Sequence, residues 1–244
     1  ISSLKIVMNG NKSVTPVFSK IVIGEPLTAE HEFLADGTLN EYNLYTNSGK
    51  VLQKEENYTK YGNLDNYDTY EYENSALKYV KHFTQAAVQT STVKNTYNSD
   101  GTLQMEQEYD AGGILSRYYI YTYTAGIKTR RQRYTAAGAV DRTWDYTYTN
   151  GLHTGTIEKD GTSTLVESKV LEYTGTNLTK ETVKDGTNAI TNIYTYEYDA
   201  SGNLRTKNRF TAANAKDKYW KYYYGAESTT NLPPKLPPTN DVWD

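Results

Sequence analysis

The sequence predicts an all-β protein built as one long antiparallel meander of repeated hairpins. Turn-forming glycines recur about every 12 or 13 residues, so equivalent turns lie roughly 25 residues apart. Tyrosine, threonine and charged residues alternate between these turns, which is the period-2 pattern of strands. Hydrophobic residues make up only 37% of the chain, and the 25 tyrosines dominate them. Tyrosine rings can pack while their hydroxyls stay in water, so they replace an aliphatic core.

Residues 1–30 differ from the rest of the chain and are expected to form an N-terminal β cap. Residues 5–8 and 17–23 are aliphatic strand candidates, and Pro16 and Pro26 punctuate them. The end units of a repeat array must cover a face that has no neighbour, so they usually depart from the repeat pattern.

Residues 31–225 form the predicted array of hairpins. Asp and Asn in the turns can bond nearby backbone, and Gly accepts the positive φ of tight hairpins. The repeats around Asn74 and Ala87 lack the glycine, so spacing alone places their turns. We expect roughly 14 to 18 strands in a sheet that twists into a curled open shell, a spiral or a half-barrel. The turns with this chemistry include Asp36-Gly37, Asn150-Gly151, Asp160-Gly161 and Asp185-Gly186.

Residues 226–244 form a proline-rich C-terminal tail. The run of prolines over residues 233–238 cannot donate to a strand ladder and favours an extended polyproline conformation. Two interpretations remain open for it. The tail either lies over the surface or covers the edge of the last strand, with Trp243 as an anchor.

Aromatic residues occupy alternate positions in the strands that precede several turns. A spacing of two places each set on one face, where neighbouring sets can align as ladders. One interpretation is that the ladders only hold a thin sheet together. The other is that they form a platform that stacks on sugar rings. The residues we assign to such a platform are Trp144, Tyr146, Tyr148, Trp220 and Tyr222.

The net charge of −3 predicts no general affinity for nucleic acid. Locally the balance is uneven, because acids predominate over residues 25–73 and bases over residues 117–142. Either the strands need charge on their solvated faces, or a charge gradient along the sheet orients a partner. The candidate charged patch consists of Lys128, Arg130, Arg131 and Arg133.

The segment from Tyr196 to Leu204, with Tyr-Asp followed by Gly-Asn-Leu, resembles the YD-repeat (RHS-like) pattern. Weaker copies lie at residues 109–115 and 134–140. In that family, β-hairpin arrays of exported bacterial proteins curl into shells or spirals, and some shells enclose a toxin domain. The chain is also similar to small tyrosine-rich secreted proteins or lipoproteins of Bacteroidetes. The resemblance implies a hairpin array in an exported setting, at the cell surface or in the periplasm. The array carries no toxin domain and has too few repeats to enclose a cargo.

The sequence shows no constellation that would carry catalysis. It has no cysteine, and its three histidines, His31, His82 and His153, have no metal-ligand spacing. Phosphate-binding, dinucleotide-binding and nucleophile-elbow motifs are absent, and no pair of acids stands out. No apolar run approaches 18 residues, so no transmembrane helix is predicted. Arginine falls on both faces of residues 127–133, which disfavours a lipid-facing barrel.

The sequence therefore predicts a non-enzymatic exported or cell-surface protein that acts as a binding or scaffolding module. The alternative is a carbohydrate-binding protein that uses its tyrosine and tryptophan rows. The expected partner is a glycan or another surface protein, without nucleic acid, cofactor or metal. A third hypothesis, an enzyme of unrecognised type, requires a concave cluster of acids with perturbed pKa values.

Overall fold

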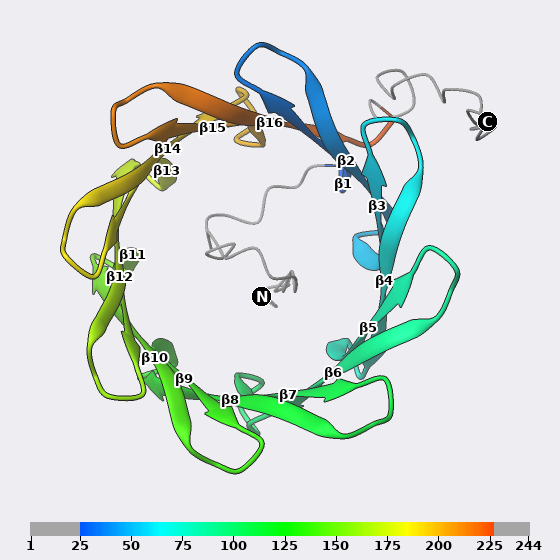
Figure 1. The fold of residues 1–244 in the computed structure, drawn as a ribbon, viewed down its shortest axis with the longest axis vertical. Coiled ribbons are helices and arrows are strands. Elements are labelled where there is room, and N and C mark those ends of the chain that lie inside the picture. The colour runs from blue at the N-terminus through cyan, green and yellow to red at the C-terminus, as the bar shows by residue number, and fades with distance from the viewer. Residues whose placement is uncertain (1–24, 227–244) are drawn as a thin grey trace, which may run out of the picture.

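The computed structural model describes residues 25–226, which form sixteen antiparallel strands in a closed barrel (Figure 1). Every strand pairs with its neighbours in sequence, and the first strand pairs with the last. The strands are β1 (Leu27–Leu34), β2 (Leu39–Ser48), β3 (Val51–Thr59), β4 (Leu64–Glu73), β5 (Ala76–Thr84), β6 (Gln89–Tyr97), β7 (Leu103–Asp110), β8 (Leu115–Thr124), β9 (Ile127–Thr135), β10 (Val140–Thr149), β11 (Leu152–Asp160), β12 (Leu165–Thr174), β13 (Asn177–Asp185), β14 (Ile190–Tyr198), β15 (Leu204–Thr211) and β16 (Lys216–Tyr224).

The all-β meander is confirmed, but the expectation of an open sheet, a spiral or a half-barrel is wrong. β1 and β16 pair from Leu27↔Tyr224 to Leu34↔Lys218 and close the ring. An open sheet would leave two rows of unpaired N–H and C=O groups, and closure removes both edges. Most of the predicted cap and nearly all of the predicted tail, residues 1–24 and 227–244, lie outside the described residues.

The two ends of the barrel use different turns. At the end where β1 leads into β2, the N–H of Gly37 donates to the carbonyl of Leu34, and Gly37 has a φ of 86°. At the opposite end the turns have two central residues, as between β8 and β9. There Ala125 and Gly126 both have positive φ, which matches a type I′ hairpin turn. These alternating turns keep successive strands adjacent and antiparallel.

Two glycines have a different role from the one predicted. Gly161 and Gly186 do not adopt positive φ; Ser163 and Asn188, each with a φ of 68°, occupy that conformation instead. A Cβ on Gly161 would lie 2.5 Å from the carbonyl oxygen of Val140 in the neighbouring strand. These glycines therefore permit a close approach between backbones rather than a left-handed turn.

Alternate residues of each strand face opposite sides, which gives the barrel an inner wall and an outer wall. The inner wall is concave, so its side chains crowd each other more than those of the outer wall. On β8, Tyr119, Tyr121 and Tyr123 are buried or half-buried, whereas Ile120 and Thr122 between them are exposed. The tyrosine rows therefore line the inside, and the strand registers extend this assignment around the ring.

Sixteen strands about 4.8 Å apart form a ring roughly 25 Å across or more, which is too wide for opposite walls to pack together. Packing therefore occurs within a wall, between neighbouring strands. The main apolar cluster lies on the inner wall of β2–β6 and contains Tyr45, Leu52, Tyr70, Leu77, Val80 and Val93.

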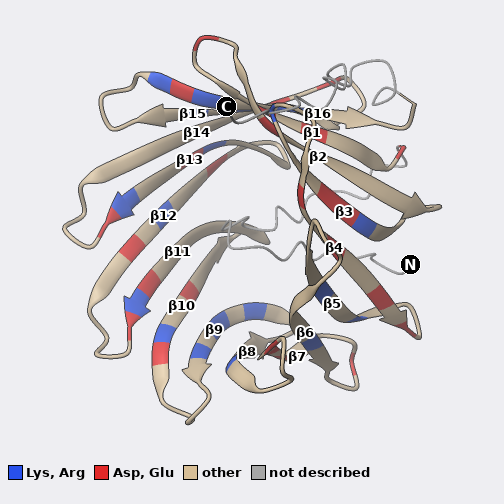
Figure 2. Cartoon of the chain, turned by 45° about the vertical axis from the view of Figure 1, so that its right-hand side comes forward, with Lys and Arg blue, Asp and Glu red and all other residues tan. Residues whose placement is uncertain are grey.

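The outer wall carries stacked aromatic pairs and ion pairs. Tyr118 and Tyr134 stack with their ring centroids 4.9 Å apart. Asp145, in the middle of β10, accepts from Arg130 at 2.6 Å and contacts Lys159 at 3.4 Å. Figure 2 shows charged residues along many strands, with basic residues on β9. Residues 25–226 include no helix of the length and hydropathy needed to cross a membrane.

Candidate functional site

The aromatic residues singled out in the sequence lie on the inner wall. Trp144, Tyr146 and Tyr148 project from β10, and Trp220 and Tyr222 project from β16. Each is half-buried, so they do not form a freely exposed platform. The two sets come from strands that are not neighbours, and each set contacts a cation. Their role in binding stays a prediction.

A repeated contact between tyrosine and glutamate runs around this wall. In each case a tyrosine hydroxyl on one strand donates to a carboxylate on the preceding strand, 15 residues earlier in sequence. Burial and the nearby carboxylates raise the pKa of these tyrosines, which keeps the hydroxyls protonated as donors. The pairs are Tyr45–Glu30 at 3.1 Å, Tyr70–Glu55 at 2.9 Å, Tyr121–Glu106 at 3.0 Å and Tyr196–Glu181 at 2.9 Å.

Two repeats place a cation where these four place glutamate. Arg131 and Lys207 occupy the glutamate position, and Tyr146 and Tyr222 follow 15 residues later. A tyrosine O–H cannot donate to a cation. Within residues 25–226, the structure gives neither of these hydroxyls a hydrogen bond.

The Arg131 cluster consists of Arg131 with Tyr119, Tyr121, Trp144 and Tyr146. The guanidinium carbon lies 3.9 Å from the centroid of the Trp144 ring and 5.1 Å from that of Tyr119. Its Nε atom is buried and lacks a hydrogen-bond partner. Burial opposes the charge, but Tyr146, Tyr121 and a nearby glutamate raise the pKa of Arg131 above its ordinary value. The cluster therefore holds a permanent positive charge.

The Lys207 cluster consists of Lys207 with Tyr194, Tyr196, Trp220 and Tyr222. The ammonium nitrogen lies 4.5 Å from the centroid of the Tyr194 ring and 5.0 Å from that of Trp220. Burial lowers the pKa of Lys207, and nearby carboxylates oppose this shift. No carboxylate of the described chain forms an ion pair with this lysine.

The two clusters are copies related by the sequence repeat. Every member of the Lys207 cluster lies 75 or 76 residues after its counterpart in the Arg131 cluster, which corresponds to three repeats of about 25 residues. The counterparts are Tyr119 and Tyr194, Tyr121 and Tyr196, Arg131 and Lys207, Trp144 and Trp220, and Tyr146 and Tyr222.

Tyr148 has a different environment. Its hydroxyl donates to the carbonyl oxygen of Lys128 at 2.8 Å, and Tyr123 and Tyr224 make the same bond to carbonyls 20 residues before them. This repeated bond ties the end of one strand to the start of the preceding one. Tyr148 therefore serves the barrel itself.

The predicted charged patch is divided between the two walls. Lys128, Arg131 and Arg133 lie on the inner wall, and Arg130 lies on the outer wall. Arg133 is paired with Asp141 through two hydrogen bonds of 2.8 and 2.9 Å. Lys128 lies over the Tyr146 ring at 4.3 Å. The four cations thus do not form one surface.

An acidic arc covers the inner wall from β1 to β7. The sequence does not distinguish these residues, because each one is another charge on an alternating strand. For Glu30, Glu55 and Glu106 the signal was the spacing of 15 residues to a tyrosine, which becomes visible once the registers are known. His82 lies in the arc, and its Nδ1 is 2.6 Å from Oδ1 of Asp68. The carboxylates of the arc are Glu30, Glu32, Glu41, Glu55, Asp68, Glu106 and Glu108.

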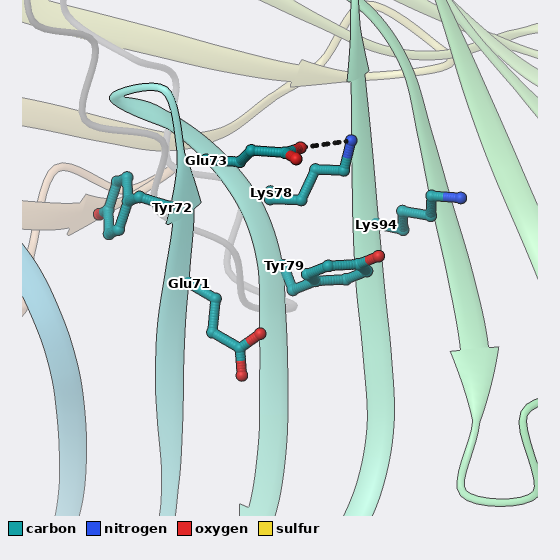
Figure 3. Close-up of a pocket in the computed structure, with 6 residues that line it drawn as sticks. All are labelled: Glu71, Tyr72, Glu73, Lys78, Tyr79 and Lys94. Carbon is teal, nitrogen blue, oxygen red and sulfur yellow. Dashed lines mark ion pairs between the residues drawn. The ribbon is translucent and has the colours of Figure 1, made fainter.

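A separate hollow of about 460 Å³ lies near the turn between β4 and β5 (Figure 3). Figure 3 shows the Glu73 carboxylate facing the Lys78 ammonium group across the strands, and the two are 3.1 Å apart. Glu71, Tyr79 and Lys94 also line this hollow. It contains none of the residues assigned to the aromatic platform or the charged patch, and Glu71 pairs with Lys81 outside it.

No group of three or more His, Asp or Glu side chains within the described chain is arranged to hold a metal ion. No protein-family model matches the sequence. No curated protein matches it either.

Several solved structures are weakly similar. A porin-like protein from Bacteroides uniformis ATCC 8492 aligns at 11% identity over 83% of this chain and 99% of its own, with a TM-score of 0.44. A porin-like protein from Bacteroides vulgatus ATCC 8482 aligns at 8% identity over 82% and 99%, with a TM-score of 0.35. The Photorhabdus luminescens Tc holotoxin pore aligns at 11% identity over 76% and 15%, with a TM-score of 0.22. Similarity at these levels carries no argument about function.

Proposed function

We propose that this protein is a non-enzymatic binding protein whose recognition surface is the inner wall of the barrel. One observation carries the proposal. The Arg131 and Lys207 clusters combine aromatic rings with cations that have no ion-pair partner in the described chain. Sixteen strands enclose an aqueous interior. A ligand that enters it would meet both clusters.

We propose that the protein is exported and lies at the cell surface or in the periplasm, as the YD-repeat resemblance implies. The charged residues of the outer wall support the proposal that water surrounds the barrel. Arg130 and Asp145 pair near the middle of β9 and β10, and Lys159, near the end of β11, contacts the same carboxylate. Each cation placed at the middle of a bilayer would cost roughly 2–4 kcal/mol.

Carbohydrate is the ligand class that the inner wall fits best. Sugar rings stack on the faces of aromatic side chains, and tryptophan gives a large contact area at a low entropic cost. Trp144 and Trp220 are half-exposed on the same wall, and each has a tyrosine two positions later in its strand. These features support the alternative considered from the sequence.

The arrangement of acids supports a role without catalysis. Glycoside hydrolysis uses two carboxyl groups roughly 5 to 10 Å apart, one of them with a raised pKa. Burial raises the pKa of Glu106 and of Glu167. Glu167 lies opposite Glu158 on the neighbouring strand, but Glu158 accepts a hydrogen bond from Trp144 and Glu167 pairs with Lys169. Glu106 accepts a hydrogen bond from Tyr121.

The test is a glycan-array screen of the wild type beside a Trp144→Ala, Trp220→Ala double variant. The matched control is Tyr118→Ala with Tyr134→Ala, which removes a stacked aromatic pair from the outer wall. We expect the wild type and the control to bind the same glycans and the tryptophan variant to lose them. A folded wild type that binds no glycan would overturn the carbohydrate assignment. Binding that survives in the tryptophan variant would move recognition away from the inner wall.

A further inference from the structure

We infer that the Arg131 and Lys207 clusters are two equivalent subsites for an acidic carbohydrate, a sugar that carries a carboxylate or a sulfate. This inference rests on the proposed function, that the inner wall binds carbohydrate. Beyond that function, it specifies that the ligand is negatively charged and that two clusters hold the charge.

The first argument is that most other inner-wall cations already have an anionic partner. Arg131 and Lys207 instead contact only the faces of aromatic rings within the described chain. A cation removed from bulk water without a counter-charge favours an anion that can approach it. The paired cations are Arg117 with Glu108, Arg133 with Asp141, Arg142 with Glu158, Lys169 with Glu181, Arg209 with Asp217 and Lys218 with Glu32.

The second argument comes from the repeat. In four repeats the tyrosine hydroxyl at this level donates to a glutamate on the preceding strand. In the repeats of Arg131 and Lys207 the carboxylate is replaced by a cation, and the hydroxyls of Tyr146 and Tyr222 keep no partner in the described chain. Each cluster thus presents a cation and a hydroxyl donor without the carboxylate that four of the other repeats supply. A carboxylate or sulfate on a ligand supplies the missing acceptor.

The third argument is the geometry around Arg131. At 3.9 Å from the Trp144 centroid, the planar guanidinium lies against the indole ring. A guanidinium carries five N–H donors, and the buried Nε–H of Arg131 has no acceptor among the described residues. Trp144 is fixed in turn by a 3.0 Å hydrogen bond from Nε1 to Glu158. A sugar ring on this aromatic wall would hold its acidic group near Arg131.

The surrounding charge selects against nucleic acid. Single-stranded nucleic acid needs a continuous basic groove along its backbone. Here Arg131 and Lys207 lie on separate strands, β9 and β15, and the carboxylates of Glu106 and Glu181 act on them electrostatically. The acidic arc of β1–β7 covers much of the remaining wall. A ligand with isolated, widely spaced charges fits this pattern, and an acidic oligosaccharide has such charges.

The experiment compares an oligogalacturonate with its fully methyl-esterified form, which has the same rings without the charge. A sulfated dextran oligomer separates sulfate from carboxylate, and poly-glutamate supplies carboxylates without sugar rings. Affinity is measured by calorimetry and by tryptophan fluorescence at low salt. The variants are Arg131→Met and Lys207→Met, with Arg130→Met as the control. That control removes the same charge from the neighbouring residue on the outer wall.

We expect the wild type to bind at least one of the charged oligomers about tenfold more tightly than the methyl ester. Arg131→Met and Lys207→Met should each remove part of that preference, the double variant should remove most of it, and Arg130→Met should keep it. The comparison of the charged oligomers with the methyl ester on the wild type tests the preference for charge even where a variant fails to fold. Equal affinity for the acid, the sulfate and the ester would overturn the inference and leave carbohydrate binding intact. Binding of poly-glutamate as tight as that of the acidic sugars would also overturn it. No binding of any of these oligomers, together with an empty glycan array, would instead remove the proposed function.

Discussion

The hydroxyl of Tyr196 lies 2.9 Å from Oε2 of Glu181, on the strand before it. This contact recurs on the inner wall, and it identifies the two repeats in which a cation stands in place of the glutamate. The pattern separates tyrosines that hold the barrel together from tyrosines whose hydroxyls make no hydrogen bond within residues 25–226. The same residue type at the same level therefore has two roles, which substitution to phenylalanine can distinguish.

We expect Tyr196→Phe to lower the free energy of unfolding by roughly 1–2 kcal/mol, because a hydrogen bond to a charged acceptor is lost. Tyr146→Phe is the matched change at a hydroxyl that makes no hydrogen bond to the described residues, and it should cost less than about 0.5 kcal/mol. Urea unfolding followed by tyrosine and tryptophan fluorescence measures both. Equal losses in the two variants would contradict the distinction between the repeats.

The turn at Ala87 offers a stabilising change. Ala87 has a φ of 59°, at a position where other repeats have glycine, such as Gly37 and Gly62. A left-handed conformation costs a residue with a Cβ roughly 1–2 kcal/mol, and the greater freedom of glycine in the unfolded chain offsets part of that. We expect Ala87→Gly to raise the free energy of unfolding by roughly 0.5–1 kcal/mol. Ala86→Gly, at ordinary φ, should lower it, and a gain in both variants would show that the φ at Ala87 is not the cause.

Gly161 tests the close approach between backbones. Its Cβ would lie 2.5 Å from the Val140 carbonyl oxygen, so Gly161→Ala forces the two strands apart. We expect a loss of roughly 1–3 kcal/mol in the free energy of unfolding. Gly112→Ala is the control, because its Cβ would meet only the Asp110 side chain, at 3.3 Å. A thermal melt of both variants gives the comparison, and an unchanged melting temperature for Gly161→Ala would show that the backbones relax freely.

Local features of the fold followed from the sequence, and its closure did not. The spacing placed a turn at Ala87 without a glycine, and the structure has positive φ there. Asp and Gly chemistry also marked turns, although at Gly161 it suggested the wrong conformation. Closure depends on pairing between Leu27 and Tyr224, at opposite ends of the array. Neither strand carries a signal for a partner so distant in sequence.

The candidate site was predictable only in part, because alternation identifies a shared face without showing which face is inside. Trp144 and Tyr146 were placed together on one face from their spacing. Both faces of the strands carry charge, so hydrophobicity could not identify the concave one. The importance of Lys207 depends on registers across β14–β16, where its ammonium group meets rings from two neighbouring strands. Those registers become visible only in three dimensions.

We expect the buried side chain of His31 to lower the free energy of unfolding in acid. The imidazole is 2% exposed and packs against Tyr42 and Tyr223, with ring centroids 5.7 and 4.7 Å away. Burial, together with the charge of Lys221, lowers the pKa of His31 to about 4 from its ordinary value of 6.5. The folded state therefore favours the neutral ring. Its contribution is fully present above pH 6.5 and is lost as the pH falls from 6.5 towards 4, by at most about 3 kcal/mol.

We expect His31→Phe to remove this acid dependence, because phenylalanine fits the aromatic surroundings and cannot be protonated. His82 is present in both proteins, so its titration contributes equally to both pH dependences. Burial opposes its charge, but the hydrogen bond to Asp68 raises the pKa of His82 above the ordinary value. Its contribution is therefore present below pH 6.5 and is lost only as the pH rises through its higher folded pKa. Urea unfolding at pH 4.5 and pH 8 should show a smaller difference in the variant than in the wild type. The same difference in both proteins would mean that His31 is not the group that destabilises the barrel in acid.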